Sequence, residues 1–309
     1  MSEKELMFSV SLITYNQEEY IAQTIESIVN QKHDYPYELI IGDDASHDRT
    51  PEIIREYAEK YPDIIKLIFN QSNMGILKNF SNVLSHCKGK YIMECAGDDW
   101  WLPGKVQKQI SFMEENSDVG MCYGKVQAYK SGRKSAEFEG IKRETFDELL
   151  YKGNIIPAVT VCYKRELYEN YVKEIKPETQ NWLMEDYPMW LYMSHESKIR
   201  FLNEKFACYR ILPCSASHNT NNIEKALAFQ KSFWNIQDFF SRRYFDKQFE
   251  PFNEHYSRAL IYVSEKNMKL ARKEFLQSGI NDLKTRIYVA VCSSGILFMM
   301  YRLYMKIKY

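Results

Sequence analysis

The chain has 309 residues with 41 basic and 41 acidic side chains, so its total charge gives no sign of a nucleic-acid or acidic partner. Apolar residues make up 45% and charged residues 27%, which argues against disorder and indicates a folded protein of about one to three domains. Seven cysteines without a Cys-x-x-Cys pair argue against a disulfide framework or a zinc site and favour a reducing compartment.

Before Val119 the chain alternates between short β-rich runs and amphipathic helical stretches. Predicted strands cover Phe8–Thr14, Tyr37–Gly42, Ile64–Phe69 and Lys90–Cys95, and helices follow near Asn16, Thr50, Ile76 and Pro103. Asn16, with Glu19 three residues later, predicts a capping box at the first helix. Repeated β-α units of this kind predict an α/β fold with a mainly parallel sheet and right-handed crossovers.

After Val119 the pattern becomes mixed. Val119–Tyr129, Pro157–Lys164 and Ile199–Ile211 are expected to be extended, Thr145–Lys152 and Met184–His195 helical, and Asn222–Tyr244 and Phe252–Gln277 two long helices. We therefore expect one domain over residues 1–218, in halves 1–118 and 119–218, and a helical C-terminal extension over 219–309.

The last part of the chain is basic and contains an apolar run. Residues 266–309 carry nine basic and two acidic side chains, and 287–301 contain no charge. At about 1.5 Å per residue this run is short for a bilayer of about 30 Å. Its basic flanks suit a helix lying in the interface of an anionic membrane, so we expect 284–309 to associate with one. A helix packed on the protein and a true membrane span are the alternatives.

Two adjacent carboxylates, Asp98 and Asp99, follow the fourth predicted strand. Open α/β sheets bind ligands at the carboxyl ends of their strands. Adjacent carboxylates repel each other unless a cation lies between them, and oxygen ligands suit Mg²⁺ or Mn²⁺. Such an ion would hold a diphosphate. The alternative is a solvated loop that carries two acids.

Polar residues also follow the other predicted strands and should meet at the same edge of the sheet. They are Thr14, Tyr15 and Asn16 after the first strand, Asp43 and Asp44 after the second, and Asn73 and Lys78 after the third. Helix N-termini at this edge would favour a phosphate-bearing ligand. The chain has no dinucleotide-binding or P-loop glycine motif, no zinc-protease motif and no hydrolase nucleophile elbow.

These motifs resemble those of family 2 glycosyltransferases with the GT-A fold, in order and spacing, over about residues 8–215. The matching segments are Val10–Asn16, Gly42-Asp43-Asp44, Asn73-x-Gly75, Gly97-Asp98-Asp99 and Met184-Glu185-Asp186-Tyr187. The resemblance implies a Rossmann-like, mostly parallel sheet flanked by helices, with a nucleotide-sugar half before residue 119 and an acceptor half after it.

The resemblance also implies roles for individual residues around a nucleotide-sugar donor. Tyr15 would lie against the base, Asp44 would accept a hydrogen bond from it, Asp98 would face the ribose or the metal, and Asp99 would bind the metal. Thr14, Asn16, Asn73 and Lys78 would complete the donor site, and Arg210 or His218 would reach a phosphate from a flap.

Asp186, with Glu185 beside it, matches the general base of the family. An acidic first turn of a helix, stabilised by the helix dipole, is the alternative for this pair.

The predicted protein is an inverting glycosyltransferase that uses Mn²⁺ or Mg²⁺ and a nucleotide-sugar donor, with UDP the expected nucleotide. Its acceptor would be a hydroxyl of a glycan or lipid-linked glycan in polysaccharide assembly. We expect it in the cytoplasm, peripheral at the inner face of the cytoplasmic membrane. A nucleotidyltransferase on a related sheet is one alternative, and a catalytically silent homologue acting as a membrane-bound partner or glycan-binding subunit is another.

Overall fold

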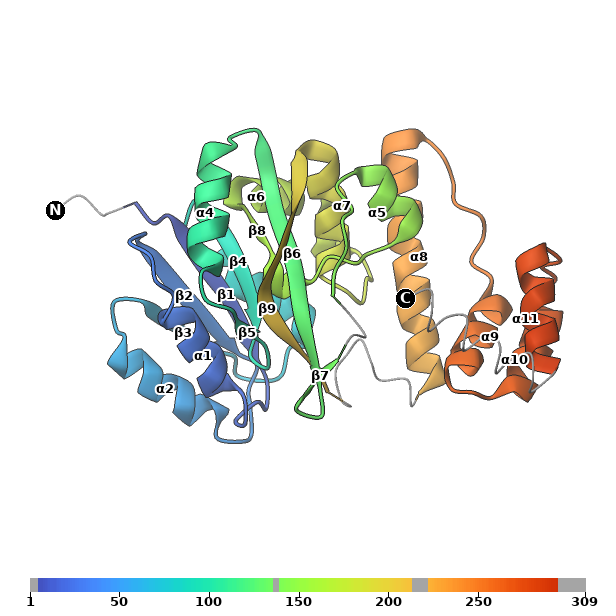
Figure 1. Cartoon of the computed structure of the whole chain (residues 1–309), viewed down its shortest axis with the longest axis horizontal. Coiled ribbons are helices and arrows are strands. Elements are labelled where there is room, and N and C mark those ends of the chain that lie inside the picture. The colour runs from blue at the N-terminus through green and yellow to red at the C-terminus, as the bar shows by residue number, and fades with distance from the viewer. Residues whose placement is uncertain (1–4, 136–138, 213–221, 294–309) are drawn as a thin grey trace. The chain divides into compact units, whose positions relative to one another are not determined.

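The computed structural model describes residues 5–135, 139–212 and 222–293. Its contacts divide the chain into two compact units, Met1–Leu212 (unit 1) and Pro213–Tyr309 (unit 2). Unit 1 is an α/β body built on one sheet, and the described part of unit 2 is helical (Figure 1).

The sheet of unit 1 has nine strands. Its strands are β1 (Phe8–Thr14), β2 (Tyr37–Asp43), β3 (Ile65–Phe69), β4 (Tyr91–Ala96), β5 (Trp100–Trp101), β6 (Val119–Lys130), β7 (Arg133–Ser135), β8 (Cys162–Lys164) and β9 (Lys198–Ile211). The order is β3-β2-β1-β4-β8-β6-β9-β5, with β7 paired to β6 (Figure 1). Strands β1 to β4 are parallel to one another, as the alternating pattern predicts.

Helices connect and cover these strands. They are α1 (Ile21–Val29), α2 (Thr50–Lys60), α3 (Ile76–Ser85), α4 (Lys105–Glu115), α5 (Phe146–Lys152), α6 (Arg165–Ile175) and α7 (Asp186–Glu196), with short 3₁₀ turns at Ala158–Thr160 and Pro177–Thr179. In α1, Ile21, Ile25 and Ile28 recur at helical spacing and are buried, which is the apolar stripe expected from the sequence. They join Phe8, Val10 and Leu12 of β1 in the main core.

The start of α1 differs from the predicted capping box. The helix begins at Ile21, after an N-cap residue, Tyr20, that makes no side-chain capping bond. Asn16 instead adopts a φ of 50° and accepts a hydrogen bond of 2.8 Å from the backbone N–H of His47. The side chain of Asn16 therefore bonds to the loop after β2 instead of capping the helix, and the capping-box prediction is wrong.

Two further boundaries differ from the predictions. The predicted helix Phe252–Gln277 is two helices, because Lys266 has a φ of 62° and Asn267 caps a new helix by accepting from the N–H of Leu270. The predicted strand Pro157–Lys164 is a strand only over Cys162–Lys164, after the 3₁₀ turn.

Unit 2 contains α8 (Ile223–Phe245), α9 (Glu254–Ser264), α10 (Met268–Gln277) and α11 (Leu283–Ser293). A small core of Ala259, Ala271 and Phe275 joins α9 to α10, and Tyr288 of α11 packs against it. Among the described residues, no helix has both the length and the apolar character needed to cross a membrane. Of the predicted membrane segment 284–309, residues 294–309 lie outside the described part.

Candidate functional site

The carboxyl ends of β1, β2 and β4 lie side by side. Thr14 of β1 pairs with Asp43 of β2, and Ile13 pairs with Ala96 of β4. The backbone N–H of Asp44 donates to the carbonyl of Thr14 across 3.0 Å, and that of Gly97 donates to Ile13 across 3.0 Å. The polar segments that follow these strands therefore start from one edge of the sheet, where doubly wound folds bind their ligands.

Asp98 and Asp99 follow β4 at this edge. Asp99 is 3% exposed, and its Oδ1 accepts a hydrogen bond of 2.9 Å from the backbone N–H of Arg210. Burial raises the pKa of Asp99 well above its usual range, and the neighbouring charge of Asp98 raises it further. Burial also raises the pKa of Asp98, while the nearby Arg210 acts in the opposite direction. The protein therefore only partly offsets the cost of having both carboxylates charged.

Gly97 precedes this pair because the space beside it is filled. A Cβ atom at Gly97 would lie 2.4 Å from Oε1 of Gln17 and 2.7 Å from Oγ1 of Thr14. Thr14 is buried, and its Oγ1 lies at hydrogen-bond distance, 2.8 Å, from Oε1 of Gln17. A larger side chain at position 97 would collide with Gln17 and Thr14 unless they moved.

Arg210, at the end of β9, ties that strand to the acidic pair. Its guanidinium lies 4.5 Å from the ring centre of Tyr20 and 4.4 Å from that of Trp100. It also donates to the backbone carbonyl of Asp98 and to the side chain of Gln23. These contacts fix a positive charge beside the two carboxylates. His218, the other predicted phosphate contact, lies outside the described residues.

Asp44, after β2, holds the loop that precedes α3. Its Oδ1 accepts from the N–H of Met74 across 2.8 Å and from Nδ2 of Asn70 across 2.9 Å, and its Oδ2 accepts from the N–H of Gly75 across 2.8 Å. Asn70 was not singled out from the sequence. Its partner lies 26 residues away, so no local pattern marks it.

Three of the predicted donor-site residues are exposed. Tyr15 is 42% exposed after β1. Asn73 lies directly before Met74, and Lys78 lies in the first turns of α3. Asn73 and Lys78 are exposed as well, so all three side chains are accessible from solvent.

Glu185 and Asp186 form a second acidic pair at the start of α7. Oδ2 of Asp186 accepts a hydrogen bond of 2.8 Å from Nδ2 of Asn154, and its Oδ1 accepts one of 2.6 Å from the backbone N–H of Tyr187. Burial raises the pKa of Asp186, although these two hydrogen bonds oppose the shift. Burial, together with the charge of Asp186, raises the pKa of Glu185 to about 7. A carboxylate with a pKa in this range can take up a proton near neutral pH.

Glu94, inside β4, is a further buried acid. It is 4% exposed and accepts a hydrogen bond of 2.7 Å from the hydroxyl of Tyr163. Burial raises the pKa of Glu94 to about 8, and the charges of Glu185 and Asp186 contribute to the rise. Glu94 is thus within electrostatic range of Glu185 and Asp186, and its strand β4 precedes Asp98 and Asp99 in the chain. The sequence analysis did not identify Glu94 as a candidate, although a charged residue within an apolar run could have indicated it.

The acidic pair after β4 suits a hard cation. Within the described ranges, no group of three or more His, Cys, Asp or Glu side chains could hold a metal ion. Asp44, Asp99 and Asp186 therefore do not make up one metal site by themselves. Mg²⁺ and Mn²⁺ sites that act on phosphates need only one or two carboxylates, because the ligand supplies the remaining oxygens. Asp98 and Asp99 fit such a site, since a cation would relieve their mutual repulsion.

Comparison with known sequences reveals related proteins. A sequence model of the family described as Glycosyl transferase family 2 matches residues 9–172. An uncharacterized protein of Mycobacterium tuberculosis is 35% identical over 209 residues, or 65% of this chain and 58% of the relative. The chain thus spans less than two thirds of that relative's length. WfgD of Escherichia coli, a UDP-Glc:alpha-D-GlcNAc-diphosphoundecaprenol beta-1,3-glucosyltransferase, is 27% identical over 217 residues, or 70% of this chain and 81% of WfgD.

A solved structure shares the architecture. The mannosyltransferase PcManGT from Pyrobaculum calidifontis, in complex with GDP-Man and Mn²⁺, matches with a TM-score of 0.57 and 17% sequence identity. The match covers 97% of this chain and 83% of that one. At this identity the likeness establishes a common fold.

Proposed function

The chain belongs to glycosyl transferase family 2, and we propose that it moves a sugar from a nucleoside diphosphate to a hydroxyl of a glycan or lipid-linked glycan. Its sheet and flanking helices form the GT-A fold. One observation carries the proposal: the acidic segments after β2 and β4 flank the end of β1 at a single sheet edge. Asp44 and the pair Asp98–Asp99 thereby frame one place for a nucleotide and its diphosphate.

UDP is the nucleotide we propose for the donor. The name of WfgD gives UDP-Glc as its donor, and this chain matches WfgD over 70% of its own length. Tyr15, exposed after β1, offers an aromatic face for the base. Asp44 shapes the adjoining loop through its bonds to Met74 and Gly75. Asn16, Asn73 and Lys78 remain proposed contacts of the donor.

Asp98 and Asp99 are the residues that would hold a divalent cation. Mn²⁺ or Mg²⁺ there would supply positive charge to the departing diphosphate. The chain itself contributes the Arg210 guanidinium, which Tyr20 and Trp100 hold beside these acids. This fixed charge opposes the negative charge of the two carboxylates when no ligand is bound.

We propose that Asp186 acts as the general base of an inverting transfer. The acceptor hydroxyl gives its proton to the Asp186 carboxylate as its oxygen bonds to C1 of the sugar. The bond from C1 to the diphosphate oxygen breaks on the opposite face, so the configuration at C1 inverts. Asn154 and the N–H of Tyr187 hold one oxygen each of this carboxylate and thereby fix its direction. Glu185 keeps a second acid beside it.

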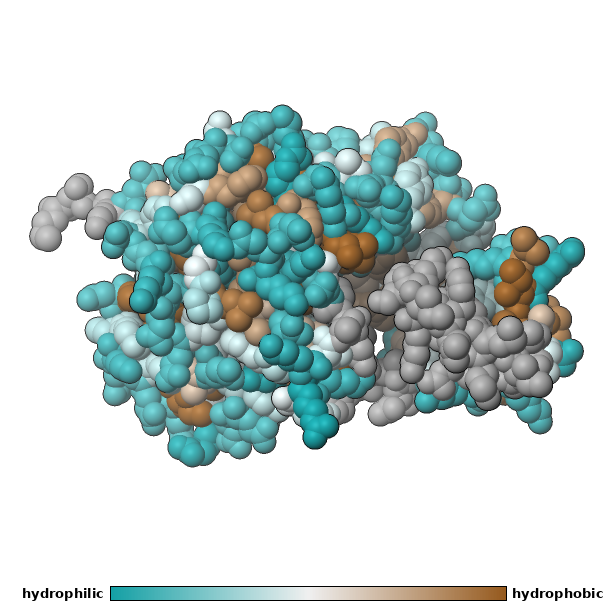
Figure 2. Space-filling view, in the orientation of Figure 1, coloured by the Kyte–Doolittle hydropathy of each residue, from teal (hydrophilic) through white to brown (hydrophobic). Residues whose placement is uncertain are grey.

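We also propose that unit 2 brings the enzyme to the inner face of the cytoplasmic membrane. Leu276, Leu283 and Ile287 are 62%, 76% and 50% exposed, and Lys284 and Arg286 lie between them in the sequence. Figure 2 shows apolar surface over α11 among hydrophilic residues. Exposed apolar side chains with basic neighbours suit an anionic lipid surface. A lipid-linked acceptor of the class named for WfgD would be met at such a surface.

A thermal-shift screen tests the donor proposal. UDP, GDP and dTDP are each added with Mn²⁺ or with EDTA, and UDP with Mn²⁺ is expected to stabilise the protein most. A ligand at about 100 times its Kd adds about 2.7 kcal/mol to the free energy of unfolding. Release of UDP from UDP-sugars, followed in parallel, tests catalysis. An unchanged melting temperature with every nucleotide would refute the proposal.

A further inference from the structure

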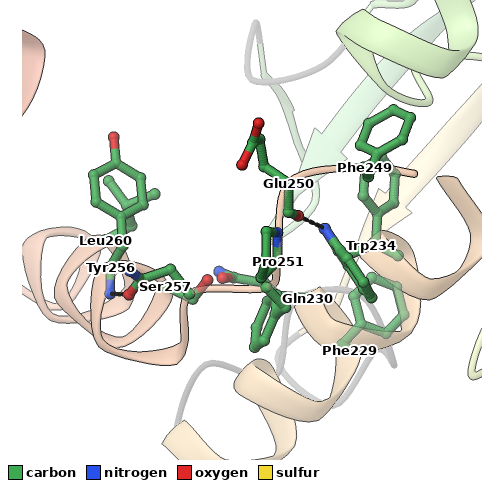
Figure 3. A pocket seen from close by; sticks show the side chains of 12 residues that line it. Phe229, Gln230, Trp234, Phe249, Glu250, Pro251, Tyr256, Ser257 and Leu260 are labelled. Carbon is green, nitrogen blue, oxygen red and sulfur yellow. Dashed lines mark hydrogen bonds between the residues drawn. The ribbon is translucent and has the colours of Figure 1, made fainter. Parts of the chain in front are cut away.

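Unit 2 contains a cavity that the proposed transfer reaction does not use. It has a volume of about 600 Å³ and lies between α8, the loop that follows it and the start of α9 (Figure 3). This volume falls in the range of pockets that hold small molecules in proteins. Six aromatic side chains line the cavity: Phe229, Phe233, Trp234, Phe249, Phe252 and Tyr256.

Several polar atoms of the wall are already bonded within the protein. Nε1 of Trp234 donates to the backbone carbonyl of Glu250 across 2.8 Å, as Figure 3 shows. The side chain of Asn253 accepts from the N–H of Tyr256 across 2.9 Å and donates to the carbonyl of Ser278 across 2.8 Å. The wall also includes Gln230, Glu250 and Ser257, but aromatic residues make up half of its twelve members. Such a wall favours a hydrocarbon over a sugar, whose hydroxyls need free donors and acceptors.

The cavity wall is packed onto the helices that carry the basic, apolar surface of unit 2. The ring of Tyr256 meets Phe275 of α10 at a centroid distance of 5.6 Å, and Phe275 stacks on Tyr288 of α11 at 5.2 Å. Lys284 and Arg286 belong to the same α11. One packed set of helices therefore combines an apolar cavity with cationic side chains, which complement a phosphate headgroup.

We propose that this cavity binds the hydrocarbon chain of a phosphate-bearing lipid. The chain contacts the aromatic wall, and the phosphate faces the basic side chains of unit 2. The identity of that lipid as the acceptor rests on the proposed function, whereas the binding of a hydrocarbon chain does not. The same chemistry is found in the isoprenoid chain of a lipid-linked glycan and in the acyl chain of a membrane lipid.

Calorimetric titration of the full chain tests the proposal with three probes. Farnesyl phosphate and dodecyl phosphate, kept below their micellar concentrations, are expected to bind with a negative heat-capacity change. Inorganic phosphate, which has no hydrocarbon chain, is expected not to bind. Tighter binding of farnesyl phosphate would identify an isoprenoid site, and equal binding a site for either chain. Absence of binding by both chain-bearing probes would overturn the proposal.

Two matched variants locate the bound chain. Phe249→Ser removes an aromatic ring from the loop after α8 and is expected to weaken both probes about tenfold. Phe245→Ser changes an aromatic residue that is 45% exposed and outside the wall, so it should leave binding unchanged. Equal effects of the two variants would contradict the assignment to this cavity.

A third measurement separates this inference from the proposed function. Stabilisation of Phe249→Ser by UDP and Mn²⁺ should equal that of the wild type, because Phe249 belongs to unit 2. A protein that binds UDP but neither lipid probe would refute only the lipid site. A protein that binds the probes but no nucleotide would refute only the proposed transfer.

Discussion

The side-chain amide of Asn154 donates a hydrogen bond of 2.8 Å to Oδ2 of Asp186, 32 residues further along the chain. The direction of the amide is fixed, because Oδ1 of Asn154 accepts from the backbone N–H of Ile156 across 3.0 Å. The N–H of Tyr187 bonds the other oxygen of Asp186. A carboxylate held on both oxygens has one preferred orientation, which is what a general base requires.

Replacing Asn154 by Ala is expected to lower kcat by about tenfold or more, since a hydrogen bond to a charged group contributes about 1.5–3 kcal/mol. Because this bond lowers the pKa of Asp186, its loss should also move the acidic limb of the pH–rate profile to higher pH. The profile of kcat against pH measures both effects. Asn203→Ala, at an exposed position of β9, serves as the control. An unshifted profile would show that Asn154 does not act through Asp186.

The two acids at the start of α7 predict a pH dependence. Burial and the charge of Asp186 raise the pKa of Glu185 to about 7, and burial raises that of Asp186 as well. Asp186 must be deprotonated to act as a base, so its raised pKa should place the acidic limb of activity at a higher pH than an ordinary aspartate would give. Glu185→Gln removes one charge of the pair and should shift the limb to lower pH while activity is kept. Asp186→Asn should abolish turnover, and comparable loss in both variants would argue against Asp186 as the only base.

The sequence predicted strands β1 to β4 because their signals are local. The apolar runs and the turn residues placed β1 to the residue and the bounds of β2, β3 and β4 to within one residue. Contacts between distant residues left no such signal. Arg210 bonds Asp99 from 111 positions away, and Asn154 reaches Asp186 across 32. The failed capping box at Asn16 has the same cause, because the loop after β2 competes for its side chain.

Asp99→Asn is expected to weaken metal binding without preventing the protein from folding. Asn keeps an oxygen that can accept the Arg210 N–H, so the variant should fold. It removes a charge from the proposed cation site, and kcat should fall by about 100-fold or more, as for other losses of transition-state charge stabilisation. The extra thermal stabilisation that Mn²⁺ adds to UDP should disappear as well. If that difference between Mn²⁺ and EDTA persists in the variant, Asp99 is not a metal ligand.

The pKa of Glu94 is raised and that of Glu38, another buried acid, is lowered, so we expect the two residues to affect the pH dependence of stability in opposite directions. Burial raises the folded-state pKa of Glu94 to about 8, so the folded protein keeps this proton where the unfolded chain has lost it. Stability should therefore fall as the pH rises from about 4.5 to about 8, by on the order of 4 kcal/mol. Gln resembles the protonated acid and still accepts from Tyr163. Glu94→Gln should thus raise the melting temperature more at pH 8 than at pH 5.

Glu38 of β2 provides the matched control, since it is 1% exposed and also lies in a strand. Burial alone would raise its pKa, but hydrogen bonds from Lys66, Ser9 and the N–H of Lys88 lower it overall. A lowered pKa gives stability that is present above the unfolded-state value and lost only in acid. Glu38→Gln should therefore lower the melting temperature at both pH 5 and pH 8. Equal responses of the Glu94 and Glu38 variants would mean that Glu94 is ionised in the folded protein and that its environment stabilises the charge.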